Sequence, residues 1–167
     1  PEGPGRSSLV INREGLATVL STPGDPSGPV ELADVGNLRT YLYEPDGAVL
    51  RAGLVNRVAD QLGGHLLDPT IAYVTSDRLA ATPLATAFRV IDSMPFSLKR
   101  LKSALRERNI GTLEIKKRGS ALDPAKLRPQ LALKGSQSAT IVLTRLAGQQ
   151  QVLLVERVNP APHPEES

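Results

Sequence analysis

The sequence of 167 residues contains no cysteine and no tryptophan, and it has only two histidines. The lack of cysteine excludes disulfide scaffolds, cysteine-based zinc sites, iron–sulfur clusters and thiol catalysis. His65 and His163 lie far apart in the sequence, so we expect no metal site rich in histidine. Aromatic residues make up only 3% of the chain, which argues against stacking platforms for single-stranded nucleic acid.

Long apolar runs are also missing. None approaches the roughly 18 residues that a membrane helix needs, and the first five residues do not resemble a secretory signal. We therefore expect a soluble, cytoplasmic protein with no membrane partner and no bound metal. The sequence starts with Pro rather than Met, and its length suits one domain or a domain plus a fragment of another. We interpret it as a piece of a longer polypeptide.

The sequence does contain an alternation of helix-like and strand-like segments. Apolar spacing and end signals predict helices at 46–63 and 98–109, a short helix opening at Asp123-Pro124, and strands at 71–75, 86–91, 112–117, 138–146 and 151–157. Gly111 is interpreted as the residue that ends the second helix, and residues 147–150 as a hairpin loop. The expected fold class is α/β (α+β), a mixed sheet with two main helices and a C-terminal antiparallel hairpin.

The domain boundaries follow from changes in composition. Two short apolar runs at 8–11 and 17–20 predict a hairpin, and a Pro/Gly-rich stretch at 22–29 predicts a linker. We therefore divide the chain into four parts. They are residues 1–40 with the hairpin and linker, an α/β helper segment at 41–94, a basic domain at 95–158 and a loose tail at 159–167.

Charge is the most informative feature of the sequence. The net charge is only +3, yet residues 95–134 hold eleven basic and three acidic residues, so this segment is +8 and the remainder is −5. Such asymmetry indicates an anionic partner, because lysine and arginine contacts to phosphates release counterions. The alternative is an ordinary solvated basic face, and the sequence leaves the two in balance. The candidate nucleic-acid-binding residues are Lys99, Arg100, Lys102, Arg106, Lys116, Lys117, Arg118, Lys126, Arg128 and Lys134.

Catalytic motifs do not emerge from the sequence. It has no Gly-x-Gly-x-x-Gly, no Walker-type lysine loop and no serine flanked by glycines as in a nucleophile elbow. Asp60, Asp68 and Asp77 are interpreted as solvated or capping residues, and His65 as structural or surface-exposed. We therefore assign no catalytic, cofactor-binding or metal-binding residue, and an independent enzyme is the least favoured hypothesis.

Several blocks resemble the C-terminal, THUMP-like region of bacterial class I S-adenosylmethionine-dependent methyltransferases. The residues that carry this resemblance are Tyr41–Val55, Ile71–Asp77, Leu113–Gly119, Leu127-Arg128, Leu131–Gly135 and Ala139–Arg145. The Lys-Lys-Arg-Gly sequence at 116–119 is its most specific part. The family's acidic-plus-glycine cofactor motif and its Asn-Pro-Pro-Tyr-type catalytic motif are both absent from this chain.

The resemblance implies a parent methyltransferase whose catalytic domain precedes this chain and binds S-adenosylmethionine. Residues 8–20 would then be the last hairpin of that domain. Because THUMP domains are associated with RNA modification, the resemblance also implies RNA as the partner and a substrate-binding role for Lys116, Lys117 and Arg118. The alternative is a packing or dimerisation domain that has no role in nucleic-acid binding.

Overall fold

A computed structural model describes residues 6–11, 17–22, 38–68 and 70–160. Its strands are β1 (Arg6–Ile11), β2 (Ala17–Thr22), β3 (Tyr41–Pro45), β4 (His65–Asp68), β5 (Ile71–Ser76), β6 (Ala85–Pro95), β7 (Ile110–Lys117), β8 (Gln137–Leu146) and β9 (Gln149–Val158). Its helices are α1 (Gly47–Ala52), α2 (Val55–Leu62), α3 (Leu98–Glu107) and α4 (Pro124–Leu131). The predicted linker after Thr22 and most of the predicted tail lie outside the described residues.

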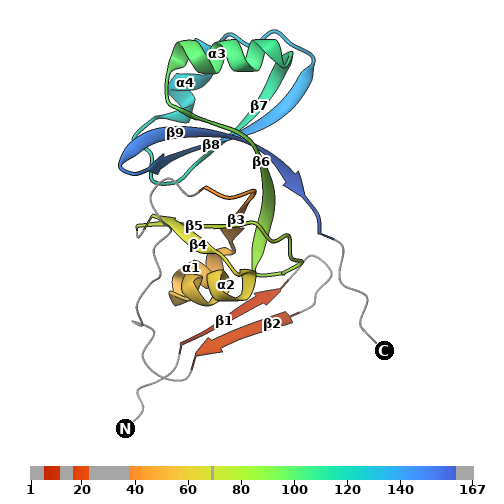
Figure 1. The fold of residues 1–167 in the computed structure, drawn as a ribbon, viewed down its shortest axis with the longest axis vertical. Helices are drawn as coiled ribbons and strands as arrows, with labels where there is room; N and C mark the ends of the chain where they lie inside the picture. Colours follow the sequence, from red (N-terminus) through yellow and green to blue (C-terminus); the bar gives the residue numbers. More distant parts are fainter. Residues whose placement is uncertain (1–5, 12–16, 23–37, 69, 161–167) are drawn as a thin grey trace. The chain divides into compact units, whose positions relative to one another are not determined.

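The strands confirm the expected mixed α/β fold (Figure 1). Seven of them form one sheet in the order β4-β5-β3-β6-β9-β8-β7. β7 and β8 run parallel and are joined through α4, whereas β8 and β9 form the expected C-terminal antiparallel hairpin. β1 and β2 pair as a separate antiparallel sheet, which confirms the predicted N-terminal hairpin. The described chain divides into two compact units, which we call the first unit (the described residues up to 88, with 157–160) and the second unit (89–156).

The core of the first unit forms where α1 and α2 pack on the strands (Figure 1). Val49 of α1 and Val58 of α2 bury their side chains in this core, and Tyr43 of β3 is fully buried. The single helix predicted at 46–63 is wrong, because the segment forms two helices. Gly53 adopts a left-handed φ of 69° and its N–H caps the last carbonyls of α1, so the chain turns there before α2 begins. Asp46 caps the start of α1, since its side chain accepts a hydrogen bond from the Ala48 N–H.

The core of the second unit lies between the helices α3 and α4 and the strands β7, β8 and β9 (Figure 1). Leu101 and Leu105 of α3 are buried there, as are Leu127 and Leu131 of α4, which agrees with the apolar spacing that predicted these two helices. Burying such a side chain contributes roughly 1.5–3 kcal/mol. These two helices therefore have one face committed to the core, and their remaining side chains face outward.

The hairpin of the second unit turns more tightly than the sequence suggested. Leu146 pairs with Gln149, so the loop has two residues rather than the four predicted at 147–150. Ala147 and Gly148 have φ values of 56° and 75°. Positive φ at both central positions is the signature of the type I′ turn, whose twist matches that of the paired strands.

Candidate nucleic-acid interface

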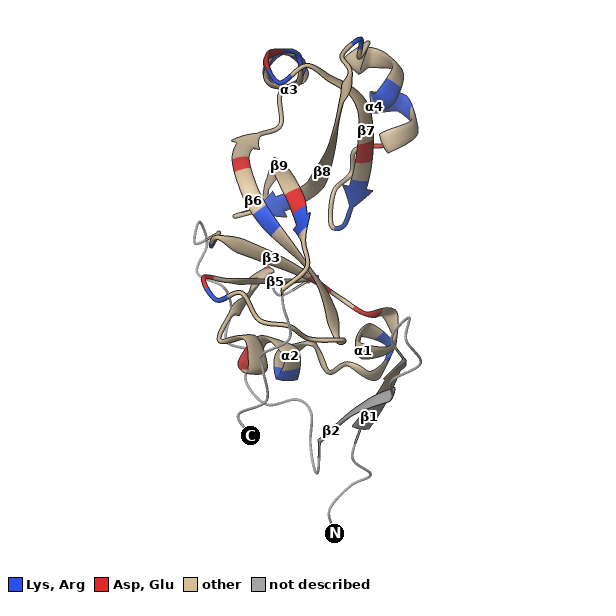
Figure 2. Ribbon diagram, turned by 90° about the vertical axis from the view of Figure 1, so that its right-hand side faces the viewer, with Lys and Arg blue, Asp and Glu red and all other residues tan. Residues whose placement is uncertain are grey.

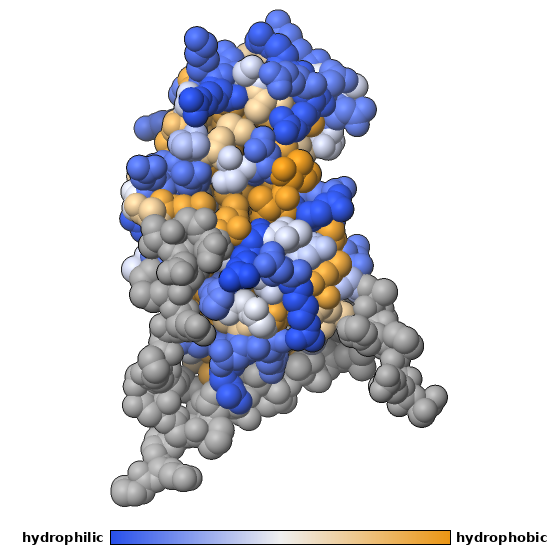
Figure 3. Space-filling model, viewed as in Figure 1, coloured by the Kyte–Doolittle hydropathy of each residue, from blue (hydrophilic) through white to orange (hydrophobic). Residues whose placement is uncertain are grey.

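The second unit carries nine of the ten predicted basic residues on α3, on α4 and at the end of β7, as the blue segments of Figure 2 show, and Lys134 follows α4. On α3, Lys99, Lys102 and Arg106 follow each other at intervals of three and four residues, so they share one face of the helix. Arg100 is exposed and lies about 100° around the helix axis from Lys99, on a different face. Figure 3 shows hydrophilic residues gathered over α3.

A cavity of about 350 Å³ lies beside this face of α3, and we call it the basic pocket. The residues that line it are Lys102, Arg106, Asn109, Ile110, Leu131, Ala132, Leu133, Lys134 and Gly135. Three of them are predicted binding residues, and they come from two segments that are far apart in the sequence. Among the described residues that line the pocket, none is acidic or aromatic. The pocket therefore presents uncompensated positive charge above an apolar wall.

A second hollow of about 440 Å³ adjoins the basic pocket along α3, and we call it the α3 groove. Lys102 and Arg106 line both, whereas Lys99 and Ser103 line the groove alone. The structure thus brings together four of the ten predicted residues, namely Lys99, Lys102, Arg106 and Lys134.

Close backbone packing holds the two sides of the basic pocket together. Gly135 N–H donates to the Ile110 carbonyl at 3.3 Å, and Gln137 N–H donates to the Asn109 carbonyl at 2.9 Å. A Cβ on Gly111 would lie 1.8 Å from the Gly135 carbonyl oxygen, and one on Gly135 would lie 2.0 Å from the Asn109 oxygen. Both positions therefore require glycine because two backbone segments touch there.

Gly111 is consequently not the end of α3, and that prediction is wrong. The helix ends at Glu107, and Asn109 makes the turn into β7 with a left-handed φ of 56°. Ala132 ends α4 in the same conformation, with φ of 47°. A left-handed alanine costs roughly 1–2 kcal/mol, and such strain gathers at functional sites. Ala132 lines the basic pocket together with Asn109, so the strained alanine lies beside the cations of the pocket.

The three cations at the end of β7 are in a different environment. Lys116 lies 3.7 Å from the Glu114 carboxylate, and its side chain is 25% exposed. Lys116 and Arg118 each take part in a further interaction within the chain, whereas Lys117 is exposed. They are not among the residues that line the basic pocket or the α3 groove.

The two cations of α4 differ from each other. The Arg128 guanidinium donates to the Leu113 carbonyl at 2.5 Å and so ties α4 to β7. Lys126 is exposed on the same helix. The structure gives Arg128 a role in holding the fold, which a count of charges does not reveal.

Sequence reasoning missed Asn109 and Gly135 as parts of the site. The Asn109 side-chain amide donates to Ser136 Oγ at 2.8 Å, which orients it at the pocket. A signal was available, because asparagine tolerates the left-handed conformation better than most residues and is common where a helix ends. Gly135 carries no signal in the sequence, since the backbone of Asn109 and Ile110 that crowds it lies 25 residues or more away along the chain.

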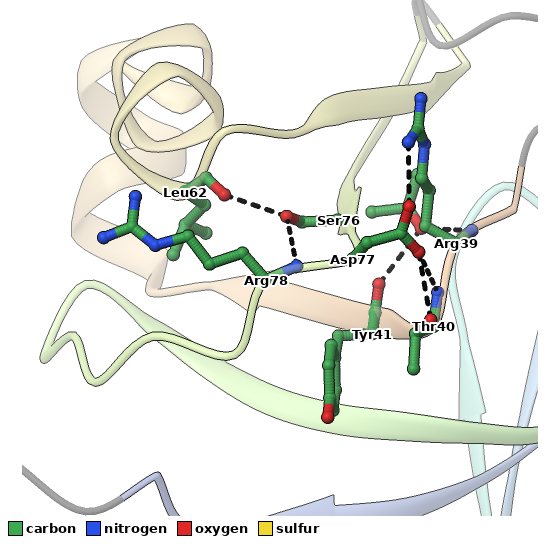
Figure 4. A network of polar contacts seen from close by, with 8 residues as sticks. Arg39, Thr40, Tyr41, Leu62, Ser76, Asp77 and Arg78 are labelled. Atoms are coloured by element: carbon green, nitrogen blue, oxygen red, sulfur yellow. Dashed lines mark hydrogen bonds and ion pairs between the residues drawn. The ribbon is translucent and has the colours of Figure 1, made fainter.

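In the first unit, Asp77 anchors a polar network (Figure 4). Its carboxylate accepts from Arg39 Nη1 at 2.8 Å and from Thr40 N and Oγ1 at 3.2 Å and 3.0 Å. The Arg39 hydrogen bond, followed by the bonds from Thr40, lowers the pKa of Asp77 below its ordinary value of 3.8. Beside it, Ser76 Oγ donates to the Leu62 carbonyl at 2.8 Å and accepts from Arg78 N–H at 3.0 Å.

These contacts explain the other polar residues that the sequence singled out. Asp77 fastens the chain before β3, and Asp68 accepts from the N–H and hydroxyl of Thr70 in a local turn. Asp60 is exposed on α2, and His65 is half-buried in β4. Within the described part of the chain, no group of three or more His, Asp or Glu residues is arranged to hold a metal ion. The helices of the described residues include none that is long and apolar enough to cross a membrane.

Comparison with known proteins confirms the resemblance seen in the sequence. Residues 85–157 match the family described as THUMP domain-like. Over 132 residues the chain is 42% identical to an uncharacterized S-adenosylmethionine-dependent methyltransferase of Mycobacterium tuberculosis, found in two strains. A crystal structure of a protein from Porphyromonas gingivalis W83, assigned as a candidate methyltransferase, superposes with a TM-score of 0.70 at 26% identity.

The chain corresponds to only part of these proteins. The matched region covers 78% of this chain but 36% of the mycobacterial relatives, and 89% of this chain but 37% of the P. gingivalis protein. The chain is therefore homologous to a region of S-adenosylmethionine-dependent methyltransferases.

Proposed function

We propose that this chain is the RNA-binding part of a cytoplasmic methyltransferase that uses S-adenosylmethionine. Residues 95–158 contact the RNA, and a separate domain of the parent protein transfers the methyl group. The proposal draws on the THUMP-like match of residues 85–157 and on the methyltransferase relatives, of which the chain spans little more than a third.

One observation supports this proposal above the others. Lys102, Arg106 and Lys134 line a single cavity whose described lining contains no carboxylate. Three like charges around one cavity repel each other, and an anion removes that repulsion. Phosphate groups supply such an anion repeatedly along a chain, and lysine and arginine contacts to them dominate the affinity of nucleic-acid-binding proteins.

The cofactor belongs to the other domain in this proposal. S-adenosylmethionine carries a positively charged sulfonium, and the basic pocket with its three cations would repel it. The described residues of this chain therefore do not fit the cofactor at this pocket, and no catalytic step is assigned to them.

A salt-dependent binding experiment tests the proposal. The affinity of the 167-residue chain for a folded RNA such as bulk transfer RNA would be measured at several salt concentrations by fluorescence anisotropy. The pocket variant K102Q/R106Q/K134Q should bind at least about tenfold more weakly. Its plot of log affinity against log salt should be shallower by about 2–3, because each lost phosphate contact removes about 0.7–0.9 from that slope.

A control variant separates the pocket from the overall charge. The exposed residues Arg51, Arg57 and Arg78 lie in the first unit. The control variant R51Q/R57Q/R78Q removes three positive charges, as many as the pocket variant does. It should bind RNA as the unmodified chain does. A second comparison, K116Q/K117Q/R118Q, measures the contribution of the β7 end. Equal weakening by the pocket variant and the control would contradict the proposal, and no RNA binding by the unmodified chain would favour the packing or dimerisation alternative.

A further inference from the structure

The basic pocket and the α3 groove share Lys102 and Arg106, so the two hollows lie against the same two side chains of α3. A ligand that occupies the pocket can extend along the groove past Lys99 without leaving positively charged surroundings. A polymer fits this arrangement better than an isolated anion, because it has further phosphates to place beside Lys99.

The size of the basic pocket points beyond a single phosphate contact. Its volume of about 350 Å³ lies within the range of about 300–1,000 Å³ that is typical of small-molecule sites. A phosphate on the smooth backbone of a duplex touches a protein surface and needs no such cavity. At the apolar wall, the half-buried Leu133 gives a sugar or a base an apolar surface to contact, and the buried Ile110 and Leu131 lie behind it.

The placement of the positive charges indicates which part of an RNA chain enters the basic pocket. Lys102 and Arg106 lie one turn apart on α3, whereas Lys134 comes from the segment between α4 and β8. An internal nucleotide carries a phosphate on each side and can meet cations from both segments. A nucleotide at the 3′ end carries one phosphodiester and would leave part of this charge unmatched.

We propose that the basic pocket is a subsite for one unpaired internal nucleotide of RNA, with its flanking phosphates held by Lys102, Arg106 and Lys134. This inference rests on the proposed RNA-binding function. The Asn109 amide, held by Ser136, retains an acceptor oxygen and one N–H that can meet a base or a ribose hydroxyl. Because the described lining has no aromatic side chain, the base is not stacked. The flanking phosphates, which carry no sequence information, supply most of the contacts, so the pocket accepts all four bases with little preference.

Three hairpin RNAs of equal stem length test the inference: one fully paired, one with a single internal bulged nucleotide and one with a single-nucleotide 3′ overhang. The unmodified chain should bind the bulged hairpin at least about fivefold more tightly than the other two. Changing the identity of the bulged base should alter the affinity by less than about threefold. Equal affinity for the bulged and fully paired hairpins would overturn the inference, and a preference for the overhang would assign the pocket to a chain end instead.

Two variants identify the pocket as the source of this preference. Leu133→Trp fills the cavity without changing charge, and it should remove the preference for the bulge while binding to the paired hairpin persists. Because Leu133 is half-buried, the exposed Lys134→Glu serves as a second variant, and circular dichroism checks that both are folded. A bulge preference that survives in both folded variants would place the unpaired nucleotide elsewhere.

A titration of the 167-residue chain with the mononucleotide AMP, monitored by NMR, separates this inference from the proposed function on which it rests. Shifts of pocket residues with AMP that are weaker with inorganic phosphate and with adenosine support a nucleotide site. AMP binding in the pocket without binding of any RNA would overturn the proposed function and leave a nucleotide site. If the chain binds RNA but shows neither a preference for the bulge nor shifts of pocket residues on addition of AMP, the nucleotide subsite is overturned and the proposed RNA-binding function stands.

Discussion

Replacing Gly135 by alanine tests how the second unit holds its two pocket walls together. Gly135 has an ordinary φ, so its backbone conformation suits alanine and the cost comes from crowding alone. The added Cβ would lie 2.0 Å from the Asn109 carbonyl oxygen, a distance that must grow to at least 3.0 Å. The three obstructing atoms, from Asn109 and Ile110, all belong to the backbone, so no flexible side chain can move aside. We expect the segments around Asn109 and Gly135 to separate.

The size of the effect follows from the contacts that the separation disturbs. Overpacking of this kind costs about 1–3 kcal/mol. The bonds from Gly135 N to the Ile110 carbonyl and from Gln137 N to the Asn109 carbonyl contribute about 1 kcal/mol each. The expected loss in the free energy of unfolding is therefore about 3–5 kcal/mol. With a urea m-value of about 2 kcal/mol/M, the midpoint of the second unit should fall by about 1.5–2.5 M.

Gly148→Ala is the matched comparison, because it makes the same chemical change in the same unit. Gly148 has a φ of +75° and no atom within 4 Å of an added Cβ, so only backbone strain opposes alanine there. That strain costs about 1–2 kcal/mol. Urea titration followed by circular dichroism would compare the two variants. A midpoint for Gly135→Ala that is as high as that of Gly148→Ala would refute the close-approach reasoning.

Two further predictions concern the polar network of the first unit. Ser76→Ala should lower the free energy of unfolding by about 2–3 kcal/mol, because the Leu62 carbonyl and the Arg78 N–H both lose a buried partner; a loss below about 0.5 kcal/mol in urea titration would contradict this. Asp77→Asn should destabilise the chain at neutral pH, where the ionised carboxylate holds Arg39. Since the pKa of Asp77 is lowered in the folded state, its contribution is complete above 3.8 and is lost as the pH falls through the lower folded value. The difference between variant and unmodified chain should therefore vanish in strong acid, and a pH-independent difference would argue against the carboxylate's role.

Much of the fold could be predicted because its signals are local. The caps at Asp46, Ser97 and Asp123 each accept from a backbone N–H two or three residues away, so the sequence alone contains both partners. The helix break at Gly53 was missed because the apolar spacing continues across it, and only the left-handed φ of that residue separates α1 from α2. Periodicity reports which face is apolar, and it does not report whether the helix is continuous.

The candidate site could be predicted only in part, because a run of charges does not say which cations converge. The face formed by Lys99, Lys102 and Arg106 follows from helical spacing. Lys134 joins it through the contact between two glycines that are 24 residues apart in the sequence, which no local pattern encodes. In the sequence, Arg128 has the same weight as the other cations, yet in the structure its guanidinium donates a hydrogen bond to the Leu113 carbonyl. The packing of Gly111 on Gly135 therefore decides which of the predicted cations line one pocket, and the function proposed for the basic segment depends on a contact that carries no charge.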